Sequence, residues 1–442
     1  MKKLLLLAAV VGVAFTGCVS DKDDLGYKGN EAQKEIKFSA PVVGKMSRTA
    51  VPGEVAKYPM NETFNVFAMW TKGEFTQWGS GPDSETQRLY MNNEKIFAQP
   101  TKNFDNDLAP IYPWTWAPES KFFWPKEGYL TFAAYSPTQV GADFTVAYAA
   151  DGLSITDFTP ETKGYQKKDL LTLDAVNTDK QSTSSVDDVQ YDLLYAPRKI
   201  NATSSTASGP DYAGVDLKFK HALSSIRFTI RVEENFADKN TRIVLNKISL
   251  LNIKNKGTFK EKITDGAIYD AAPAWTLEAD KTAYTAFECT NALSTPDQNG
   301  YDISNIVHAT DVQELAMNSG SNAIGSTNKA DNFYGYGLIL LPQEFTNAVD
   351  MSSVEESTDQ VIKVEWSLAN TTTKVAIPQV HYFDLSALKF TSSSTAGLSA
   401  AQWDMGKRYT YNLTIGLEKI FFNPVVEDWE NTVPDTPFIP VE

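Results

Sequence analysis

Cysteine is scarce in this 442-residue chain, which contains only Cys18 and Cys289. If Cys18 is modified, no disulfide can form within the chain, and Cys289 is then better interpreted as a small core residue than as a reactive thiol. Histidine is scarce too. His221, His308 and His381 lie far apart, and none has a partner at metal-ligand spacing. The sequence therefore predicts no metal site.

The chain has fewer basic than acidic residues. The chain has 40 Lys and Arg against 55 Asp and Glu, which gives a formal net charge of -15 and a pI of about 4.8. Such a surface repels phosphate backbones, so nucleic acid is not an expected partner. The hydrophobic fraction of 42% and charged fraction of 21% are typical of a globular chain, and the length suggests two or three domains.

Catalytic motifs are also missing. The sequence contains no nucleophile elbow, phosphate-binding loop or zinc-protease motif. Asp428 and Glu430 fall on one face of an expected strand, but a chain with 55 acidic residues produces such pairs by chance. The acidic residues Asp21, Asp23 and Asp24 lack the glycine and distal Glu spacing of a calcium loop. We therefore expect neither an enzyme nor a cofactor.

The first eighteen residues have the order of a bacterial export signal. Lys2 and Lys3 precede an apolar run from Leu4 to Phe15, and small residues lead into Cys18. Phe15-Thr16-Gly17-Cys18 resembles a lipobox, which predicts a signal peptide over 1–17 and a lipid on Cys18. The alternative is an ordinary signal peptide with a chance cysteine. Residues 18–35 are mostly polar and predict a flexible tether to the membrane.

The rest of the chain is organised as short strands with turns between them. Ile36-Lys37-Phe38 begins an alternating segment, and a small polar loop containing Arg48 follows. Residues 243–253 predict a strand whose register slips near Leu250-Leu251, as a bulge would cause. Tyr409 to Leu417 alternates most regularly. No sustained helical period occurs in the first half of the chain.

A Ser-, Thr-, Ala- and Gly-rich segment over 201–214 has the composition of a linker. We therefore predict an all-β protein of two tandem antiparallel β-sandwich domains, 36–205 and 206–431. The proline-rich tail 432–442 cannot pair as a central strand.

Aromatic residues cluster over 112–124, where Trp114, Trp116 and Trp124 stand among prolines. Exposed Trp faces stack on sugar rings, whereas buried ones fill sandwich interiors. The cluster thus favours a packed rim or inter-domain surface, with glycan binding as the alternative. In that alternative, the chain is a lipid-anchored surface protein that binds glycans or host matrix through exposed aromatic residues and does not polymerise.

Several motifs occur together in order over nearly the whole exported chain. They are the lipobox at Cys18, the Ile36-Lys37-Phe38 strand before the Arg48 loop, Asn65-Val66-Phe67-Ala68, Phe219-Lys220-His221-Ala222-Leu223-Ser224, Gly406-Lys407-Arg408-Tyr409 and Pro424-Val425-Val426-Glu427-Asp428-Trp429. As a set, these motifs resemble the Bacteroidetes fimbrillin family.

This resemblance implies a subunit of a type V pilus, or fimbria, built from two transthyretin-like β-sandwiches and supporting adhesion. The precursor is a lipoprotein bound to the outer membrane through its lipid. It is cut between Arg48 and Thr49, which removes a first strand represented here by Ile36 and Phe38.

The resemblance further implies that a neighbouring subunit fills the opened groove by β-strand addition. The donor candidate is the segment from Lys419 to Glu442. The anchors expected in this segment are Ile420, Phe422, Val425 and Trp429. Because the tail beyond Asn431 is proline-rich, it is either a flexible extension or the mark of an anchor or tip subunit. Other fimbrillins are the expected partners, together with host or bacterial surface ligands.

Overall fold

The computed structural model describes residues 34–39, 42–43, 63–74, 85–99, 115–136, 144–149, 152–160, 192–203, 214–232, 241–262, 271–288, 306–307, 313–316, 323–324, 338–345, 360–370, 373, 375–388, 391–392, 402–416 and 420–428. Within these ranges the regular structure consists of strands alone, so the protein is all-β, as predicted. The described residues include no helix long and apolar enough to cross a membrane.

The first sheet is built mainly from the first half of the chain and has two buried faces. All eight residues of β2 are buried, because its apolar side chains point alternately to both sides. In spatial order the strands are β1 (Val42–Val43), β9 (Lys218–His221), β8 (Leu194–Ala202), β5 (Tyr129–Ser136), β2 (Phe64–Thr71), β3 (Gln87–Gln99) and β4 (Thr115–Pro118).

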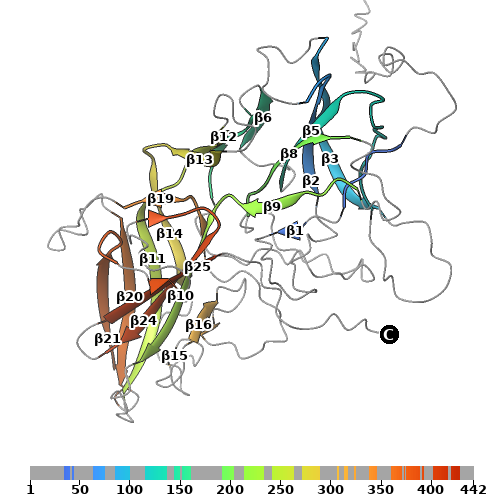
Figure 1. The fold of residues 1–442 in the computed structure, drawn as a ribbon. Coiled ribbons are helices and arrows are strands. Elements are labelled where there is room, and N and C mark those ends of the chain that lie inside the picture. The colour runs from blue at the N-terminus through green and yellow to red at the C-terminus, as the bar shows by residue number, and fades with distance from the viewer. Residues whose placement is uncertain are drawn as a thin grey trace, which may run out of the picture.

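A small sheet covers one face of the first sheet (Figure 1). Its strands are, in order, β13 (Ala271–Leu277), β12 (Gly257–Lys262), β7 (Gly152–Phe158) and β6 (Thr145–Ala149). β12 pairs antiparallel with β7, so a hairpin from the second half of the chain adds to the first half. Phe259 and Trp275 of this hairpin pack together, and Trp275 also packs against Phe158.

Two further sheets face each other across the largest core cluster and form the second sandwich. One has the order β17 (Ala323–Ile324), β16 (Gln313–Ala316), β10 (Ser224–Val232), β24 (Lys407–Ile415), β25 (Ile420–Asp428) and β22 (Thr391–Ser392), and β18 (Leu338–Leu340) also pairs with β10. The other has the order β14 (Lys281–Glu288), β11 (Thr241–Lys254), β20 (Val361–Asn370) and β21 (Val375–Asp384), and β15 (Ile306–Val307) also pairs with β11. A separate pair joins β19 (Gln343–Glu344) to β23 (Gln402–Trp403).

The pairing is mainly antiparallel, but β10 and β24 run parallel over eight residue pairs at the centre of their sheet. In β24 alternate side chains are buried, from Tyr409 through Tyr411 and Leu413 to Ile415, as the sequence pattern predicts. The register slip expected near Leu250-Leu251 is confirmed, since β11 changes register against β14 between Leu250 and Ile253.

The division expected between residues 205 and 206 does not coincide with the limits of the sheets. β9, which lies beyond this point, pairs with β8 in the first sheet. The β12–β13 hairpin, further along the chain, pairs with β7. Burial explains this arrangement, because Phe259 is fully buried where the hairpin packs against Tyr195 of β8.

Candidate strand-binding groove

The segment 34–39 lies between two stretches of the first half of the fold and is hydrogen-bonded to both. On one side Ile36 N–H donates to the Phe122 carbonyl (2.8 Å), and Trp124 N–H donates to the Lys34 carbonyl (2.9 Å). On the other side Val215 N–H donates to the Lys37 carbonyl (2.7 Å).

Beyond these contacts the bonding continues on the side of Val215 and β9. Both the N–H and the hydroxyl of Ser39 donate to the Val215 carbonyl, at 3.0 and 3.2 Å. Further along, β1 pairs parallel with β9 through Val42 opposite Lys218 and Val43 opposite Phe219. The segment therefore behaves as an inner strand, although its regular pairing is short.

Ile36 and Phe38 anchor the segment, and both side chains are fully buried. The Phe38 ring meets Phe64 of β2 edge-on, with a centroid separation of 6.0 Å, and Phe132 of β5 at 5.8 Å. Edge-to-face contacts of this kind add to the free energy gained from burial alone. We call the site that holds residues 34–39 and 42–43 the first-strand groove.

The floor of the groove is the face of the first sheet that the small covering sheet leaves open. Buried side chains from five strands (β2, β3, β5, β8 and β9) and from the two flanking stretches form it together with Ile36 and Phe38. Among them are Phe64, Val66, Ala68, Trp70, Met91, Ile96, Trp124, Leu130, Phe132, Ala134, Leu194, Ala196, Val215, Leu217 and Phe219. Removing the segment would expose a continuous apolar surface, which soluble proteins rarely leave uncovered.

Gly214 lets the segment approach this closely. Its φ of +112° lies in a region that side-chain-bearing residues rarely adopt. A Cβ at this position would stand 2.5 Å from the Phe38 carbonyl carbon and 2.6 Å from the Ser39 nitrogen. The groove wall therefore requires glycine to accept a strand backbone in this position.

Charge contributes little to holding the segment. Glu35 lies 3.9 Å from both the Lys37 and the Lys121 ammonium groups, and the Lys121 side chain is 70% exposed. Ion pairs this long and this well solvated add about 0–1 kcal/mol each at most. The apolar anchors and the backbone bonds therefore dominate the binding.

The donor candidates lie in a strand that is already paired. β25 pairs antiparallel with β24 along its whole length, and Ile420 is buried in the core of the second sandwich. Val425 is half-buried, and only the backbone position of Phe422 is described. On its other side β25 pairs with β22 at Val425 and Val426. Trp429 lies outside the described residues.

The proposed lipid site Cys18 and the proposed cleavage site Arg48-Thr49 also lie outside the described residues. The structure does place the other six arginines of the sequence, all of which lie within strands. They are Arg88 in β3, Arg198 in β8, Arg227 and Arg231 in β10, Arg242 in β11 and Arg408 in β24.

The structure describes the side chain of one of the three tryptophans in the aromatic cluster, Trp124. Trp124 is 5% exposed and packs edge-on against Phe132 at 6.0 Å, so it belongs to the core of the groove. Trp114 lies outside the described residues, and only the backbone of Trp116, in β4, is described. The glycan hypothesis therefore rests on Trp114 and Trp116 and stays a prediction.

Two of the three histidines have defined surroundings. His221 Nδ1 lies 2.9 Å from a carboxylate oxygen of Asp192, and both side chains are buried. His381 Nδ1 accepts from the Trp366 ring N–H at 3.1 Å, and burial lowers the pKa of His381 below 6.5. Among the described residues no group of three His, Cys, Asp or Glu side chains is arranged to hold a metal.

Comparison with solved structures defines the class of fold. The chain resembles the crystal structure of a fimbrial protein from Bacteroides vulgatus at 18% identity and a TM-score of 0.50, over 89% of this chain and 99% of that one. A proposed cell adhesion protein from Bacteroides uniformis aligns at 14% identity and a TM-score of 0.40, over 91% and 100% of the two chains. The first match shows that the two proteins share an all-β fold.

The family follows from the sequence itself. The model of the fimbrillin-like family matches residues 60–429, so this chain belongs to the fimbrillin-like family, as its motifs suggested. No curated protein matches it in sequence. Membership supports a structural, fimbrial role at the cell surface, in association with other fimbrial subunits.

Proposed function

We propose that this chain is a subunit of a type V pilus that polymerises by exchanging its first strand for a strand of another subunit. The precursor is exported as a lipoprotein through Cys18 and cleaved between Arg48 and Thr49, and the assembled pilus supports adhesion. The observation that carries the proposal is the position of Ile36 and Phe38. They are fully buried core anchors in a segment that cleavage at Arg48 would separate from the rest of the fold.

Cleavage at Arg48 would change how strongly the first segment is held in the groove, while the other contacts of the fold stay intact. Burying one Ile or Phe side chain contributes about 1.5–3 kcal/mol, so the two anchors supply about 3–6 kcal/mol. Each backbone hydrogen bond adds about 0.5–1.5 kcal/mol net. While the segment is covalently attached it stays bound. Once it is cut, a strand with better contacts can replace it.

The emptied groove has the properties that favour strand addition. The N–H groups of Trp124 and Val215 and the carbonyl of Phe122 would lose their partners, and the apolar floor would be uncovered. A strand entering the groove restores these bonds through its backbone and fills the pockets with alternate side chains. Ile420-Phe421-Phe422 repeats the spacing of Ile36-Lys37-Phe38, so Ile420 and Phe422 are suited to the same two pockets.

A second copy has to supply the strand if a filament is to grow. β25 must separate from β24 to be donated, because the two strands pair from Ile420 to Asp428. Because the donor and the groove belong to different parts of the chain, the contact is head-to-tail and need not close. The lipid on Cys18 would then be temporary, since cleavage at Arg48 releases a mature chain that begins at Thr49.

The placement of the arginines supports selective processing at Arg48. A protease binds its substrate as an extended, accessible segment, which a strand inside a sheet cannot offer without local unfolding. The six other arginines lie in such strands. An arginine-specific protease would therefore cut the folded precursor at Arg48 in preference to any of them.

Replacing Arg48 by Ala tests this function. We expect the variant to stay at precursor length after treatment with an arginine-specific protease, and to form no filaments in negative-stain images. Arg88→Lys is the matched control and should be processed like the wild type. Filaments of normal length formed by uncleaved Arg48→Ala protein would disprove the processing role.

A further inference from the structure

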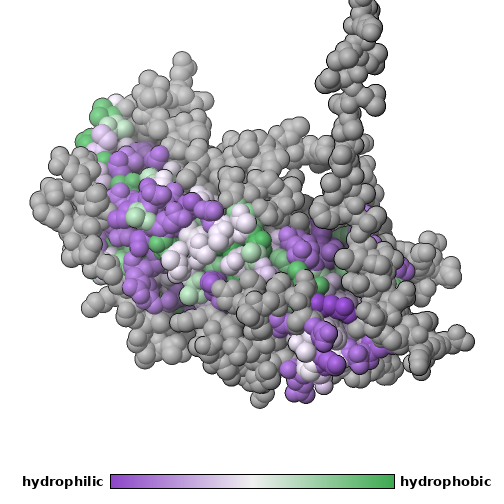
Figure 2. Space-filling view, turned by 90° about the horizontal axis from the view of Figure 1, so that it is seen from above, coloured by the Kyte–Doolittle hydropathy of each residue, from purple (hydrophilic) through white to green (hydrophobic). Residues whose placement is uncertain are grey.

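An apolar area lies on the exposed end of β21. Val375 and Ile377 are 54% and 52% exposed, and Val380, on the opposite face of the strand, is 46% exposed. These three are the large hydrophobic side chains that stand out as exposed in the described part of the chain. Among the coloured residues of the face in Figure 2, hydrophilic ones surround separate apolar areas, so a group of apolar residues on one strand needs an explanation.

Val375 and Ile377 continue a row of core residues beyond the end of the core. Along β20 the side chains of Ile362, Val364 and Trp366 point into the second sandwich and are buried. The next residue of this row, Leu368, is partly buried and pairs with Ile377, and Asn370 pairs with Val375. The face that is buried along β20 up to Trp366 is therefore open at the tip of the hairpin, where Val375 and Ile377 of β21 are exposed.

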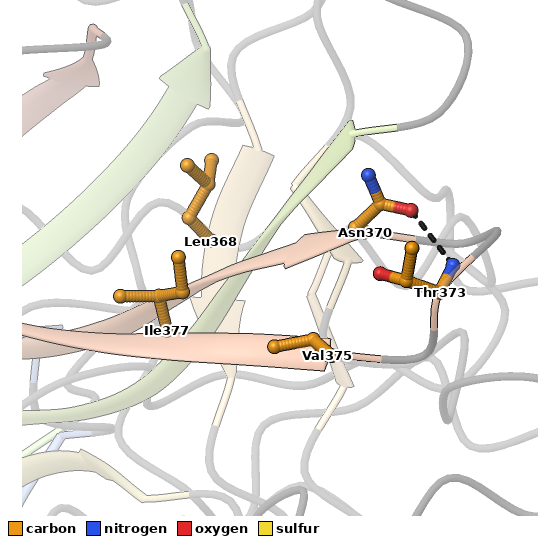
Figure 3. A pocket seen from close by; sticks show the side chains of 5 residues that line it. All are labelled: Leu368, Asn370, Thr373, Val375 and Ile377. Atoms are coloured by element: carbon orange, nitrogen blue, oxygen red, sulfur yellow. Dashed lines mark hydrogen bonds between the residues drawn. The ribbon is translucent and has the colours of Figure 1, made fainter.

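These residues line a surface pocket of about 370 Å³, together with Asn370 and Thr373 (Figure 3). The Thr373 N–H donates to the Asn370 side-chain oxygen at 2.9 Å, which orders the turn on one side of the pocket. We call Leu368, Val375 and Ile377 the β21 patch. It offers an apolar surface next to a polar turn, the composition expected at a contact between proteins.

The patch lies at the same end of the sandwich as the first residue of β25. Ile420 pairs with Ile415 at the end of β24, and Ile415 pairs with Val232 at the end of β10. The chain then returns through β11, whose first residue, Thr241, pairs with Asn370. Figure 1 shows these strands converging at the end of the second sandwich remote from the first sheet.

This position determines which molecule can reach the patch. If β25 leaves its own sandwich from the end at which Ile420 pairs with Ile415, it extends beyond this end, and the subunit that receives it lies against the same end. Pro378, in the middle of β21, supplies no N–H group, which disfavours a continuous backbone ladder with another chain. The contact therefore uses side chains.

We propose that the β21 patch packs against the copy whose first-strand groove accepts this chain's β25. The inference rests on the proposed strand exchange and adds to it a second contact site at the same junction. The acceptor's groove can take up β25 only after the acceptor's own first segment has left, so the two subunits meet at this junction only after processing. The contact therefore forms after processing, and precursors do not associate through it.

The double variant Val375→Ser/Ile377→Ser tests this site in the full chain after cleavage at Arg48. Val380→Ser is the matched control, because it removes a valine of similar exposure (46%) from the other face of the same strand. We expect the double variant to raise the protein concentration needed for half-maximal polymerisation, measured by light scattering, by about tenfold or more. The control should polymerise like the wild type.

A second measurement separates this inference from the strand exchange. A synthetic peptide of residues 420–442 should bind the cleaved wild type and the cleaved double variant equally, because the peptide lacks β21. Equal polymerisation of the double variant and the wild type, with peptide binding intact, overturns the patch but leaves strand exchange standing. Failure of the peptide to bind cleaved wild type overturns both. Precursor dimers abolished by the double substitution would show a two-fold contact and also overturn the inference.

Discussion

Replacing Phe38 by Ala should destabilise the precursor strongly and the mature polymer not at all. Phe38 is fully buried and contacts the rings of Phe64 and Phe132. Removing such a side chain costs about 3–5 kcal/mol, from lost burial and from the cavity that remains. After cleavage at Arg48 the substituted residue is no longer part of the protein, so polymers of the variant and the wild type have identical chains.

The measurement is urea-induced unfolding of the purified precursor, followed by tryptophan fluorescence. We expect the free energy of unfolding to fall by about 3–5 kcal/mol for Phe38→Ala. Phe64→Ala is the control, because it alters the groove floor and should weaken the precursor and the polymer alike. A loss below about 1 kcal/mol for Phe38→Ala in the precursor would refute the assignment of Phe38 as an anchor.

Further predictions concern the groove wall, the core and pH. Gly214→Ala should lower the free energy of unfolding by about 1–3 kcal/mol in urea titrations, because the added Cβ meets the Phe38 backbone. Gly73→Ala is the control: a Cβ there meets open space, and the free energy of unfolding should not fall. Glu261→Gln should lower the free energy of unfolding by about 3–5 kcal/mol in the same assay, because it breaks a buried ion pair with Arg198 (3.6 Å). Asp216→Asn is the control: it removes an exposed ion pair with Lys218 and should leave the urea midpoint unchanged. Burial lowers the pKa of His381, so the neutral side chain contributes its full stability above pH 6.5, and this contribution is lost as the pH falls toward the folded-state pKa. The free energy of unfolding should therefore differ less between pH 7.5 and pH 5 in His381→Gln than in the wild type.

Local pattern was sufficient to predict much of the fold. Alternation identified β24 and the buried face of Tyr409, Tyr411 and Leu413, because side chains in a strand point to opposite faces in turn. The slip near Leu250 was visible because the apolar period itself changes there. The Ile36-Lys37-Phe38 pattern likewise predicted a strand, and both of its apolar residues are in the core.

Strand partners could not be predicted in the same way. Alternation shows which face of a strand is buried but not which strand lies beside it, since pairing joins residues far apart in the chain. The parallel pairing of β10 with β24 and the addition of β12 and β13 to β7 are both of this kind. The position of Gly214 against Phe38 also depends on a long-range approach, so nothing in the local sequence marked it as part of the groove.

The groove itself can be followed directly by hydrogen–deuterium exchange in peptides that contain Trp124 and Val215. Their amides donate to Lys34 and Lys37 in the precursor, so exchange should be slow there. In cleaved monomer from which the first segment has been removed, exchange should be fast, and in the polymer it should be slow again. Protection that persists after the segment is removed, or that never returns on polymerisation, would contradict strand exchange in this groove.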